Sequence, residues 1–340
     1  MHKIPFAKID LGKEEIKAIT NIINNGWVVL GPKSQEFEKE FAKYVGTKHA
    51  IFVDSATSAM FLALKYLKPK PGQKILVPSL TFVSTAEVIV NAGCVPVFAD
   101  VDLDSLCLDK ANWKGLSIPV HVAGNKAEFK SKMYDSAHRI GKNDVKGSDA
   151  IWCYSLYATK NITTVQGGMI CTNSDKANAW LRLARDHGLS LGTKERYQGR
   201  YKQYDVSFVG FRFKGDDLRA AIGLEQLKKL PAINKRRDEL VKRYNKAFGL
   251  NRSGNHLYPI LVKDRTKFMN DMMDMGIQSA VHFRPLHTMT AYKNFPRLGK
   301  LPNTEFLGEH IVSIPLFPKL TNQEQDYIIE TILKSDQLIK

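Results

Sequence analysis

The sequence predicts an α/β fold in which a large, three-layer domain with a mostly parallel sheet is followed by a smaller α+β domain at the C-terminus. Two observations predict this class. Amphipathic segments alternate with short apolar segments of strand length between residues 13 and 170, which is typical of a parallel sheet covered by helices. The chain has 340 residues, enough for one large and one smaller domain. We assign 1–225 to the large domain and 226–340 to the small one.

Two helices are predicted at the start of the chain, because apolar residues recur there every three or four positions. The first covers residues 13–25, and the second follows the turn at Gly31 and Pro32. The apolar residues of these two stripes are Ile16, Ile19, Ile22, Ile23, Phe37, Phe41 and Tyr44. We expect about the first 12 residues to pack on the smaller domain.

Short apolar segments predict the strands of the large domain. They cover His49–Val53, Lys74–Val77, Val95–Asp100 and Ile118–Val122, and three further segments that end at Asp135, Tyr154 and Ile170. Amphipathic segments at 57–67 and 81–91 predict helices that cover the sheet. In such a sheet the carboxyl ends of the parallel strands share one edge, where ligands bind.

The smaller domain is predicted from the pattern of the last third of the chain. A long helix that begins near residue 226 and runs through Tyr244 connects the two domains. Strand-like segments follow at 257–262 and 279–283, and helices are predicted at 265–276 and 321–334.

The composition is that of an ordinary globular enzyme, with 44% hydrophobic and 25% charged residues. No apolar run is long enough to span a bilayer, and the N-terminus lacks the pattern of a signal peptide. The four cysteines have no metal-ligand spacing. We therefore expect reduced thiols, no metal site, no membrane attachment and a cytoplasmic location.

The net charge of +16 and the pI near 9.5 are high for an enzyme of this size. Nucleic acid, an acidic membrane or a polyanionic small substrate could each account for such a charge. The densest basic group, at 235–243, alternates with acidic residues at helical spacing, which favours a solvated helix face. We expect no nucleic-acid partner, whereas a nucleotide diphosphate substrate is compatible with the charge and not required by it.

Two residues near strand ends carry the chemistry. Asp135 ends the apolar segment of MYDSAH, and Lys160 lies between two strands in YSLYATKNITTVQGGMI. A nucleophilic lysine and a buried aspartate are what pyridoxal phosphate requires, because the amine condenses with the aldehyde while the carboxylate keeps the pyridine nitrogen protonated. Taken singly, a solvated lysine and a strand-end aspartate remain the alternatives.

A series of motifs surrounds these residues and extends along nearly the whole chain. In order they are IPFAKIDLGKEEI, NNGWVVLGPKSQEFEKEFAKYVGTKHAIFV, DSATSAMFLAL, VPSLTFVSTAEVIVNAGCVPVFADVD, YDSAH, SLYATKNITTVQGGM, RDHG, GFRFKGDDLRAAIGLEQLKKL, HFRPLH and SIPLFP. The series resembles the DegT/StrS family of nucleotide-sugar aminotransferases, which have fold type I and depend on pyridoxal phosphate. The resemblance implies transfer of an amino group, with glutamate as donor, to the keto group of a nucleotide-linked sugar.

Carried over position by position, the resemblance implies roles for individual residues. Lys160 would form the Schiff base and move the proton, and Asp135 would pair with the pyridinium. The cofactor phosphate would be held by backbone and hydroxyl groups at the start of a helix and on a strand end. These phosphate-binding residues are Ala56, Thr57, Ser58 and Ser155, and simple helix capping is the alternative for the serines and the threonine.

Three further residues complete the implied site. Phe82 would stack on the cofactor ring and His138 would contact its phenolic oxygen, with core packing as the alternative for both. Arg212 would reach the cofactor phosphate of a neighbouring subunit, so the active unit would be at least a homodimer with shared sites. Arg284 is a candidate for the donor carboxylates, and a surface role is an equal alternative.

The sequence also departs from the family pattern. Gln166 stands where an acid is usual, and Arg212 where Asn or Lys is common. Residues 123–131 leave nine residues between two predicted strands, too few for a crossover helix, and the segment 251–255 is also short. We expect neighbouring helices to close the gap and Phe129 to fill it.

Two other functions are alternatives to the aminotransferase. A sugar dehydratase of the same family has histidine in place of the Schiff-base lysine, and a regulatory cofactor-binding protein could lose the lysine or the aspartate. Lys160 and Asp135 are both present, so the sequence favours the enzyme.

Overall fold

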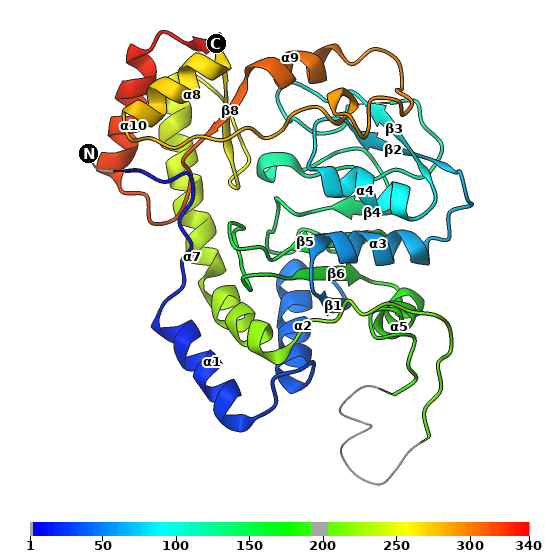
Figure 1. Cartoon of the computed structure of the whole chain (residues 1–340). Coiled ribbons are helices and arrows are strands. Elements are labelled where there is room, and N and C mark those ends of the chain that lie inside the picture. Colours follow the sequence, from blue (N-terminus) through cyan, green and yellow to red (C-terminus); the bar gives the residue numbers. More distant parts are fainter. Residues whose placement is uncertain (1–2, 110, 192–202, 340) are drawn as a thin grey trace. The chain divides into compact units, whose positions relative to one another are not determined.

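The computed structural model describes residues 3–109, 111–191 and 203–339, and the chain divides into two compact units (Figure 1). We call residues 1–10, 72–131 and 231–340 the first unit, and residues 11–71 and 132–230 the second unit. The break at 230/231 lies near the predicted boundary at 225, whereas the grouping of 72–131 with the C-terminal part was not expected. A division into domains 1–225 and 226–340 stays a prediction.

The second unit is built on a four-stranded sheet with the order β1-β6-β5-β4 (Figure 1). The strands are β1 (His49–Val53), β4 (Met133–Asp135), β5 (Ile151–Ser155) and β6 (Gly168–Thr172). β6 runs antiparallel to both of its neighbours, while β4 and β5 are parallel. Three of these four strands therefore point the same way, and β6 returns between them as the second strand of a hairpin with β5.

Helices cover both faces of this sheet and make the predicted three layers. They are α2 (Pro32–Val45), α3 (Ala56–Tyr66), α5 (Asp175–Ala184) and the start of α7 (Asp217–Phe248). The helix α1 (Lys13–Asn25) belongs to the same unit. Alternate residues of the strands face opposite sides. Phe52, Tyr154 and Met169 form a hydrophobic cluster with residues of α2 on one side of the sheet. The helix α3 packs on β5 and β6 and contributes no residue to this cluster.

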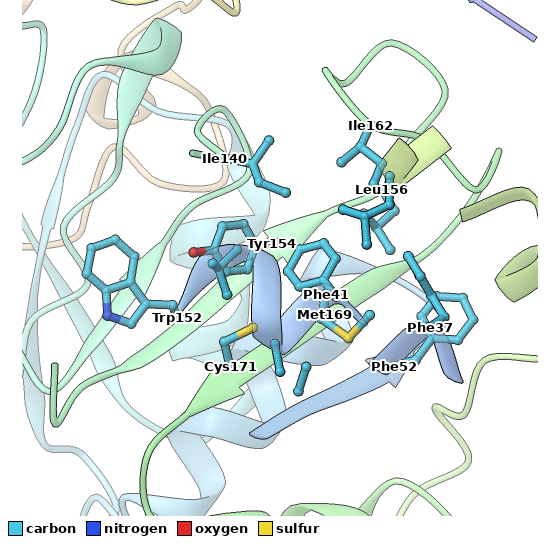
Figure 2. Packing of buried hydrophobic residues seen from close by; sticks show 14 of the residues in the cluster. Phe37, Phe41, Phe52, Ile140, Trp152, Tyr154, Leu156, Ile162, Met169 and Cys171 are labelled. Carbon is cyan, nitrogen blue, oxygen red and sulfur yellow. The ribbon is translucent and has the colours of Figure 1, made fainter. Parts of the chain in front are cut away.

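Aromatic side chains fill the layer between α2 and the sheet, as Figure 2 shows. The Phe37 ring meets the Phe52 ring edge-on with centroids 5.3 Å apart. Phe41 meets Tyr154 at the same distance. Edge-to-face pairs of this kind stabilise the fold beyond the burial of apolar area. The spacing of the aromatic residues on α2 therefore determines which face of this helix packs on the sheet.

The first unit contains a parallel pair of strands, β2 (Lys74–Pro78) and β3 (Val95–Ala99), joined by α4 (Val83–Asn91). Its C-terminal part has the antiparallel sheet β8-β7-β9, packed with the end of α7 and three further helices. These elements are β7 (Tyr258–Val262), α8 (Arg265–Asp274), α9 (Pro302–His310), β8 (Ile311–Ile314), α10 (Asn322–Lys334) and β9 (Leu338–Ile339). Ile4, near the N-terminus, lies in the core of this C-terminal part.

Two predicted strands are wrong. Ile118 makes a backbone hydrogen bond to Leu76 of β2, but 118–122 is not a strand, because Pro119 lacks the N–H that a strand with neighbours on both sides needs. The segment 279–283 forms a single bridge, between Ala280 and Ser313. It turns away afterwards, and the short 3-10 helix Leu286–Thr288 follows.

The short segment after residue 122 also has its own structure. A single 3-10 turn, Val122–Gly124, replaces a crossover helix. Phe129 is partly buried and packs on the cluster that contains Leu76, Val97 and Leu108, as expected for a residue that fills the gap. No helix in the described parts of the chain is long and apolar enough to cross a membrane, and no metal-binding group of His, Cys, Asp or Glu occurs among those residues.

Candidate active site

The register of the sheet in the second unit brings the predicted residues to one edge. Asp135, the last residue of β4, pairs with Cys153 of β5. Two residues later, Ser155 at the end of β5 pairs with Gly168 of β6, which also pairs with Val53 at the end of β1. The carboxyl ends of β1, β5 and β4 therefore lie at the same edge of the sheet, with β6 between β1 and β5, and the residues that follow each strand emerge at this edge.

Lys160 lies in the loop between β5 and β6, and hydrogen bonds close this loop at its base. The Leu156 N–H donates to the Gly167 carbonyl oxygen at 2.9 Å, and the Thr164 N–H donates to the Leu156 carbonyl oxygen at 3.0 Å. The Thr163 hydroxyl also donates to the Leu156 carbonyl oxygen, at 3.2 Å. Because the base of the loop is fixed in this way, the backbone that carries Lys160 stays above the end of β5.

The environment of Lys160 makes its amine a nucleophile. Burial lowers the pKa of Lys160 to about 8, and the nearby Asp135 carboxylate acts in the opposite direction. Near neutral pH an appreciable fraction of the amine is then uncharged, whereas an exposed lysine with a pKa near 10.4 is almost fully protonated. A lowered lysine pKa is one of the ways in which enzymes activate this residue.

Asp135 and His138 belong to the turn that follows β4, and both are buried. The Ala137 N–H donates to Asp135 Oδ1 at 3.0 Å, and the Ser136 N–H donates to the Cys153 carbonyl oxygen at 2.7 Å. These bonds fix the turn that carries the carboxylate at the end of β4. The Asp135 carboxylate is close enough to Lys160 to raise the pKa of that amine against the effect of burial.

The N-terminus of α3 follows β1 at the same edge. Ser55 caps the helix, because its Oγ accepts a hydrogen bond from the Ser58 N–H at 3.1 Å and donates to Ser58 Oγ at 2.9 Å. The Ser58 amide is therefore already engaged. Within residues 3–109, 111–191 and 203–339, no hydrogen bond engages the backbone amides of Ala56 and Thr57, so they are available to an anion.

Gly168 allows this helix N-terminus to approach the sheet. A Cβ atom at Gly168 would lie 2.3 Å from the Ser55 carbonyl oxygen and 2.7 Å from the Ala56 nitrogen. No side chain fits at those distances, so the second glycine of VQGG is needed for close packing of β6 against the start of α3. The role of this glycine was missed from the sequence, although the Gly-Gly pair was the available signal.

Arg212 lies in the segment that precedes α7 and runs along the same unit. Residues 212 and 186 form an antiparallel bridge, and Lys214 pairs likewise with Val53. Lys214 Nζ also makes an ion pair of 2.9 Å with Asp186, and both side chains are largely buried. This pair was missed because the RDHG and GFRFKG motifs are far apart in the sequence.

Two predicted residues lie elsewhere. Phe82 and Arg284 belong to the first unit; the Phe82 side chain is 57% exposed at the start of α4, and Arg284 is exposed. Gln166 is exposed in the β5–β6 loop of the second unit. Core packing is therefore excluded for Phe82, whose ring is left open on one side to a ligand or a partner.

The residues at the sheet edge fit pyridoxal phosphate. An activated amine, a buried carboxylate and free amides at a helix N-terminus match the aldehyde, the pyridine nitrogen and the phosphate of this cofactor. Asp135, Lys160 and the start of α3 reach the edge from three different strands, so the donor set exists only in the folded chain.

Comparisons with known proteins agree with this chemistry. Residues 9–333 match the model of the DegT/DnrJ/EryC1/StrS aminotransferase family. The chain is 34% identical to the spore coat polysaccharide biosynthesis protein SpsC of Bacillus subtilis, over 97% of this chain and 96% of that protein. Among solved structures, the PLP form of the putative sugar aminotransferase Spr1654 of Streptococcus pneumoniae has a TM-score of 0.84 at 28% identity, with 97% of both chains covered.

Helicobacter pylori PseC, an aminotransferase involved in the biosynthesis of pseudoaminic acid, has a TM-score of 0.86 at 25% identity, with 98% of this chain and 99% of that chain covered. Spr1654 has also been solved in a PMP form, with a TM-score of 0.85 at 27% identity and coverage of 96% of this chain and 98% of that chain. The predicted fold class and cofactor are thereby confirmed. The chain belongs to the DegT/DnrJ/EryC1/StrS aminotransferase family and is a pyridoxal-phosphate-dependent sugar aminotransferase.

Proposed function

We propose that this enzyme transfers an amino group from glutamate to the keto group of a nucleotide-linked sugar. The observation that carries the proposal is the meeting of Lys160, Asp135 and the start of α3 at one edge of the sheet. When bound, pyridoxal phosphate supplies an aldehyde and a ring that accepts electrons. Residues of this chain bind the cofactor, orient it and transfer the proton.

In this proposal Lys160 has two tasks. Its uncharged amine, favoured by the lowered pKa, binds the cofactor aldehyde covalently. After its release from the cofactor, Lys160 Nζ would accept a proton from the amine-bearing carbon of the donor and return it to the aldehyde carbon of the cofactor. An amine with a pKa of about 8 is well matched to both directions, because it accepts and releases protons near neutral pH.

The remaining residues bind and orient. The buried Asp135 carboxylate keeps a proton on the ring nitrogen, and His138 contacts the phenolic oxygen from the same turn. The amides of Ala56 and Thr57, with the hydroxyls of Thr57, Ser58 and Ser155, bind the phosphate. Arg284 remains a candidate for the carboxylates of the donor.

Two observations support a nucleotide-linked sugar as the acceptor. The net charge of +16 favours a polyanionic substrate such as a nucleotide diphosphate. SpsC is named for spore coat polysaccharide biosynthesis, and PseC is named for the biosynthesis of pseudoaminic acid. Both names agree with an acceptor used in sugar synthesis.

Four buried free cysteines support a reducing, cytoplasmic location.

A homodimer with shared sites is part of the same proposal. Part of the apolar stripe of α1 is exposed, since Ile16 is 66% and Ile23 is 59% exposed, whereas Ile22 is buried. Val28 and Val29 follow it and are also exposed, as is Val209, at 90%. Large exposed apolar residues grouped along the chain in this way support an interface, and in a homodimer Arg212 would reach the partner's phosphate.

The substrate is tested by running the reaction in reverse. Purified enzyme is supplied with 2-oxoglutarate and a panel of aminated nucleotide sugars, and glutamate formation is measured. We expect glutamate from at least one nucleotide-linked amino sugar and none from the same sugar without its nucleotide. Equal rates with free sugars would contradict the nucleotide, and activity only with 2-oxo acids other than 2-oxoglutarate would contradict the donor.

A further inference from the structure

The loop between β5 and β6, which carries Lys160, has a strained tip at Val165 and Gln166. Val165 has a φ of +71°, in the left-handed region. Among the non-glycine residues of positive φ in the described parts of the chain, it is the one β-branched residue, and a branched side chain is strained in this region. Such strain persists only where the surrounding structure enforces it.

Two buried threonines enforce the conformation of the tip. The Val165 N–H donates to Thr163 Oγ1 at 2.8 Å, and the Thr164 hydroxyl donates to the Gln166 carbonyl oxygen at 2.7 Å. Both threonines are at most 2% exposed. Gly167 leaves room for this arrangement, because a Cβ atom there would lie 2.3 Å from Thr164 Oγ1. The backbone at position 165 is therefore held by its neighbours and does not depend on the valine side chain.

The Val165 side chain recovers little of the strain by packing. It is 45% exposed, and Gln166 beside it is exposed as well. The large aliphatic residues Leu156 and Ile162 of the same loop are instead buried in the cluster between α2 and the sheet (Figure 2). A glycine would adopt the left-handed backbone without strain. The valine methyl groups thus contribute little to the folded chain alone, which points to a contact with a bound molecule.

The chemistry of the tip distinguishes between the two substrates. Lys160 is the only charged residue of the loop 156–167, so the tip has no cation for the carboxylates of an amino-acid donor. A valine placed against a carboxylate would remove water from the charge without replacing its hydrogen bonds. A sugar ring combines apolar C–H groups with hydroxyls, which match the methyl groups of Val165 and the amide of Gln166.

We infer that Val165 is a specificity-determining residue that contacts an apolar edge of the acceptor sugar, while Gln166 bonds to its hydroxyl groups. The inference rests on the proposed role of Lys160, five residues earlier on the same loop. An acceptor must bring its keto carbon to the cofactor that this lysine binds, so it must also approach the rest of the loop. The glutamate donor makes no contact with the tip.

Two half-reactions of the enzyme loaded with pyridoxal phosphate test the inference. Either glutamate or an amino sugar removes the visible absorption band of the bound cofactor, and stopped-flow absorbance gives an apparent second-order rate constant for each amine. The amino sugar is the compound, free or nucleotide-linked, that reacts fastest with the wild type in the reverse-reaction panel. We expect Val165→Gly to lower the rate constant for the amino sugar about 10-fold and that for glutamate less than about 2-fold.

Two further variants separate the contact from backbone effects. Val165→Thr keeps the branched shape and the strain but replaces a methyl group by a hydroxyl, so it should also slow the amino sugar selectively. Val206→Gly changes a valine of the same unit that is 49% exposed and lies in a bridge with Leu189, and it should leave both rate constants unchanged.

Stability supplies a second measurement. The urea midpoint of Val165→Gly should stay near that of the wild type, because relief of the strain offsets the greater freedom of glycine in the unfolded chain. Val206→Gly gains no such relief and should have a lower midpoint. A loss of stability in Val165→Gly as large as that in Val206→Gly would show that position 165 is not strained.

Three results would overturn the inference: an unchanged amino-sugar rate constant in Val165→Gly, equal slowing of both amines in either Val165 variant, or a changed oligomeric state of Val165→Gly in light scattering. Equal slowing would mean that Val165 acts through Lys160, and a changed oligomeric state would place Val165 in a subunit contact. The proposed function is judged separately, by which amino compounds react with the wild-type enzyme and by loss of covalent cofactor binding in Lys160→Ala.

Discussion

The Ala123 carbonyl oxygen accepts hydrogen bonds from the backbone N–H groups of His256, at 3.0 Å, and Leu257, at 3.2 Å. This contact joins the two segments that are short in the sequence, 123–131 and 251–255. Gly124 and Gly254 make the approach possible, because Cβ atoms there would lie 2.6 Å from the Asn255 nitrogen and 2.4 Å from the Ala123 carbonyl oxygen, respectively. The two shortened segments therefore pack against each other, and Leu307 and Ile311 belong to the same hydrophobic cluster as Val122 and Ala123.

Gly124→Ala should destabilise the protein by at least about 3 kcal/mol, because the substitution combines a left-handed backbone with a steric clash. The control is Gly72→Ala, whose φ of +71° is also left-handed but whose Cβ would meet nothing within 4 Å. The control should cost only about 1 to 2 kcal/mol. Urea denaturation gives both free energies of unfolding, and equal losses would contradict the close contact.

Lys160→Ala should abolish covalent cofactor binding, because the loop between β5 and β6 contains no second lysine. The purified variant given pyridoxal phosphate should lack the visible absorption band of the covalently bound cofactor and should show no transaminase activity. Lys142→Ala, which removes an exposed lysine of the same unit, should keep both. An unchanged spectrum in Lys160→Ala would remove the central role of this residue.

The lowered pKa of Lys160 predicts how fast the cofactor-free enzyme captures pyridoxal phosphate at different pH values. Only the uncharged amine reacts, so the rate should rise through about pH 8 and then level off, rather than continue to rise towards pH 10. Stopped-flow absorbance measures this rate. A midpoint of the rate near pH 10 would show that Lys160 is solvated.

The lowered pKa of Lys160 also affects stability. Between about pH 8 and the ordinary lysine pKa near 10.4 the unfolded chain binds more protons than the folded one, so the contribution of this group to the free energy of unfolding increases with pH.

Asp135→Asn should keep the cofactor bound and lower kcat by about 100-fold or more, because the ring loses the partner of its nitrogen while the side chain keeps its shape. Absorbance after gel filtration measures retained cofactor, and the reverse reaction measures turnover. Asp149→Asn, at an exposed position of the same unit, is the matched control. Turnover near that of the control would exclude the pairing of Asp135 with the ring nitrogen.

Mixing two inactive variants tests the shared site. Lys160→Ala and Arg212→Ala protomers would each be inactive alone, but a heterodimer contains one site with both residues intact. We expect mixed samples to regain up to about a quarter of the wild-type activity, because half of the protomer pairs are mixed and each has one complete site. Subunit exchange is verified by native mass spectrometry, and exchange without any recovery would contradict a contribution of Arg212 in trans.

Much of the fold was open to prediction because its signals are local. Apolar residues at helical spacing predicted α1 and α2, and the short apolar runs at β1, β2 and β3 were found within a residue of their observed ends. Strand prediction failed at 118–122 and 279–283. Apolar content there was right for a strand, but pairing depends on neighbours that the sequence does not name, and Pro119 removes one donor.

The residue types of the site were likewise readable. Lys160, Asp135 and the SATS segment are recognisable from their motifs, and the family and cofactor they suggested are confirmed. Their individual roles stay predictions.

The sequence by itself determined which chemical groups this protein carries; the tertiary structure decided which of them meet. The register that aligns Asp135, Ser155 and Gly168 at one edge depends on hydrogen bonds between strands far apart in the chain. The pKa of Lys160 depends on burial, and the bond between Ser79 and His287 joins residues 208 positions apart. Burial and long-range contact exist only after the chain has folded, so these properties could not be read from local sequence patterns.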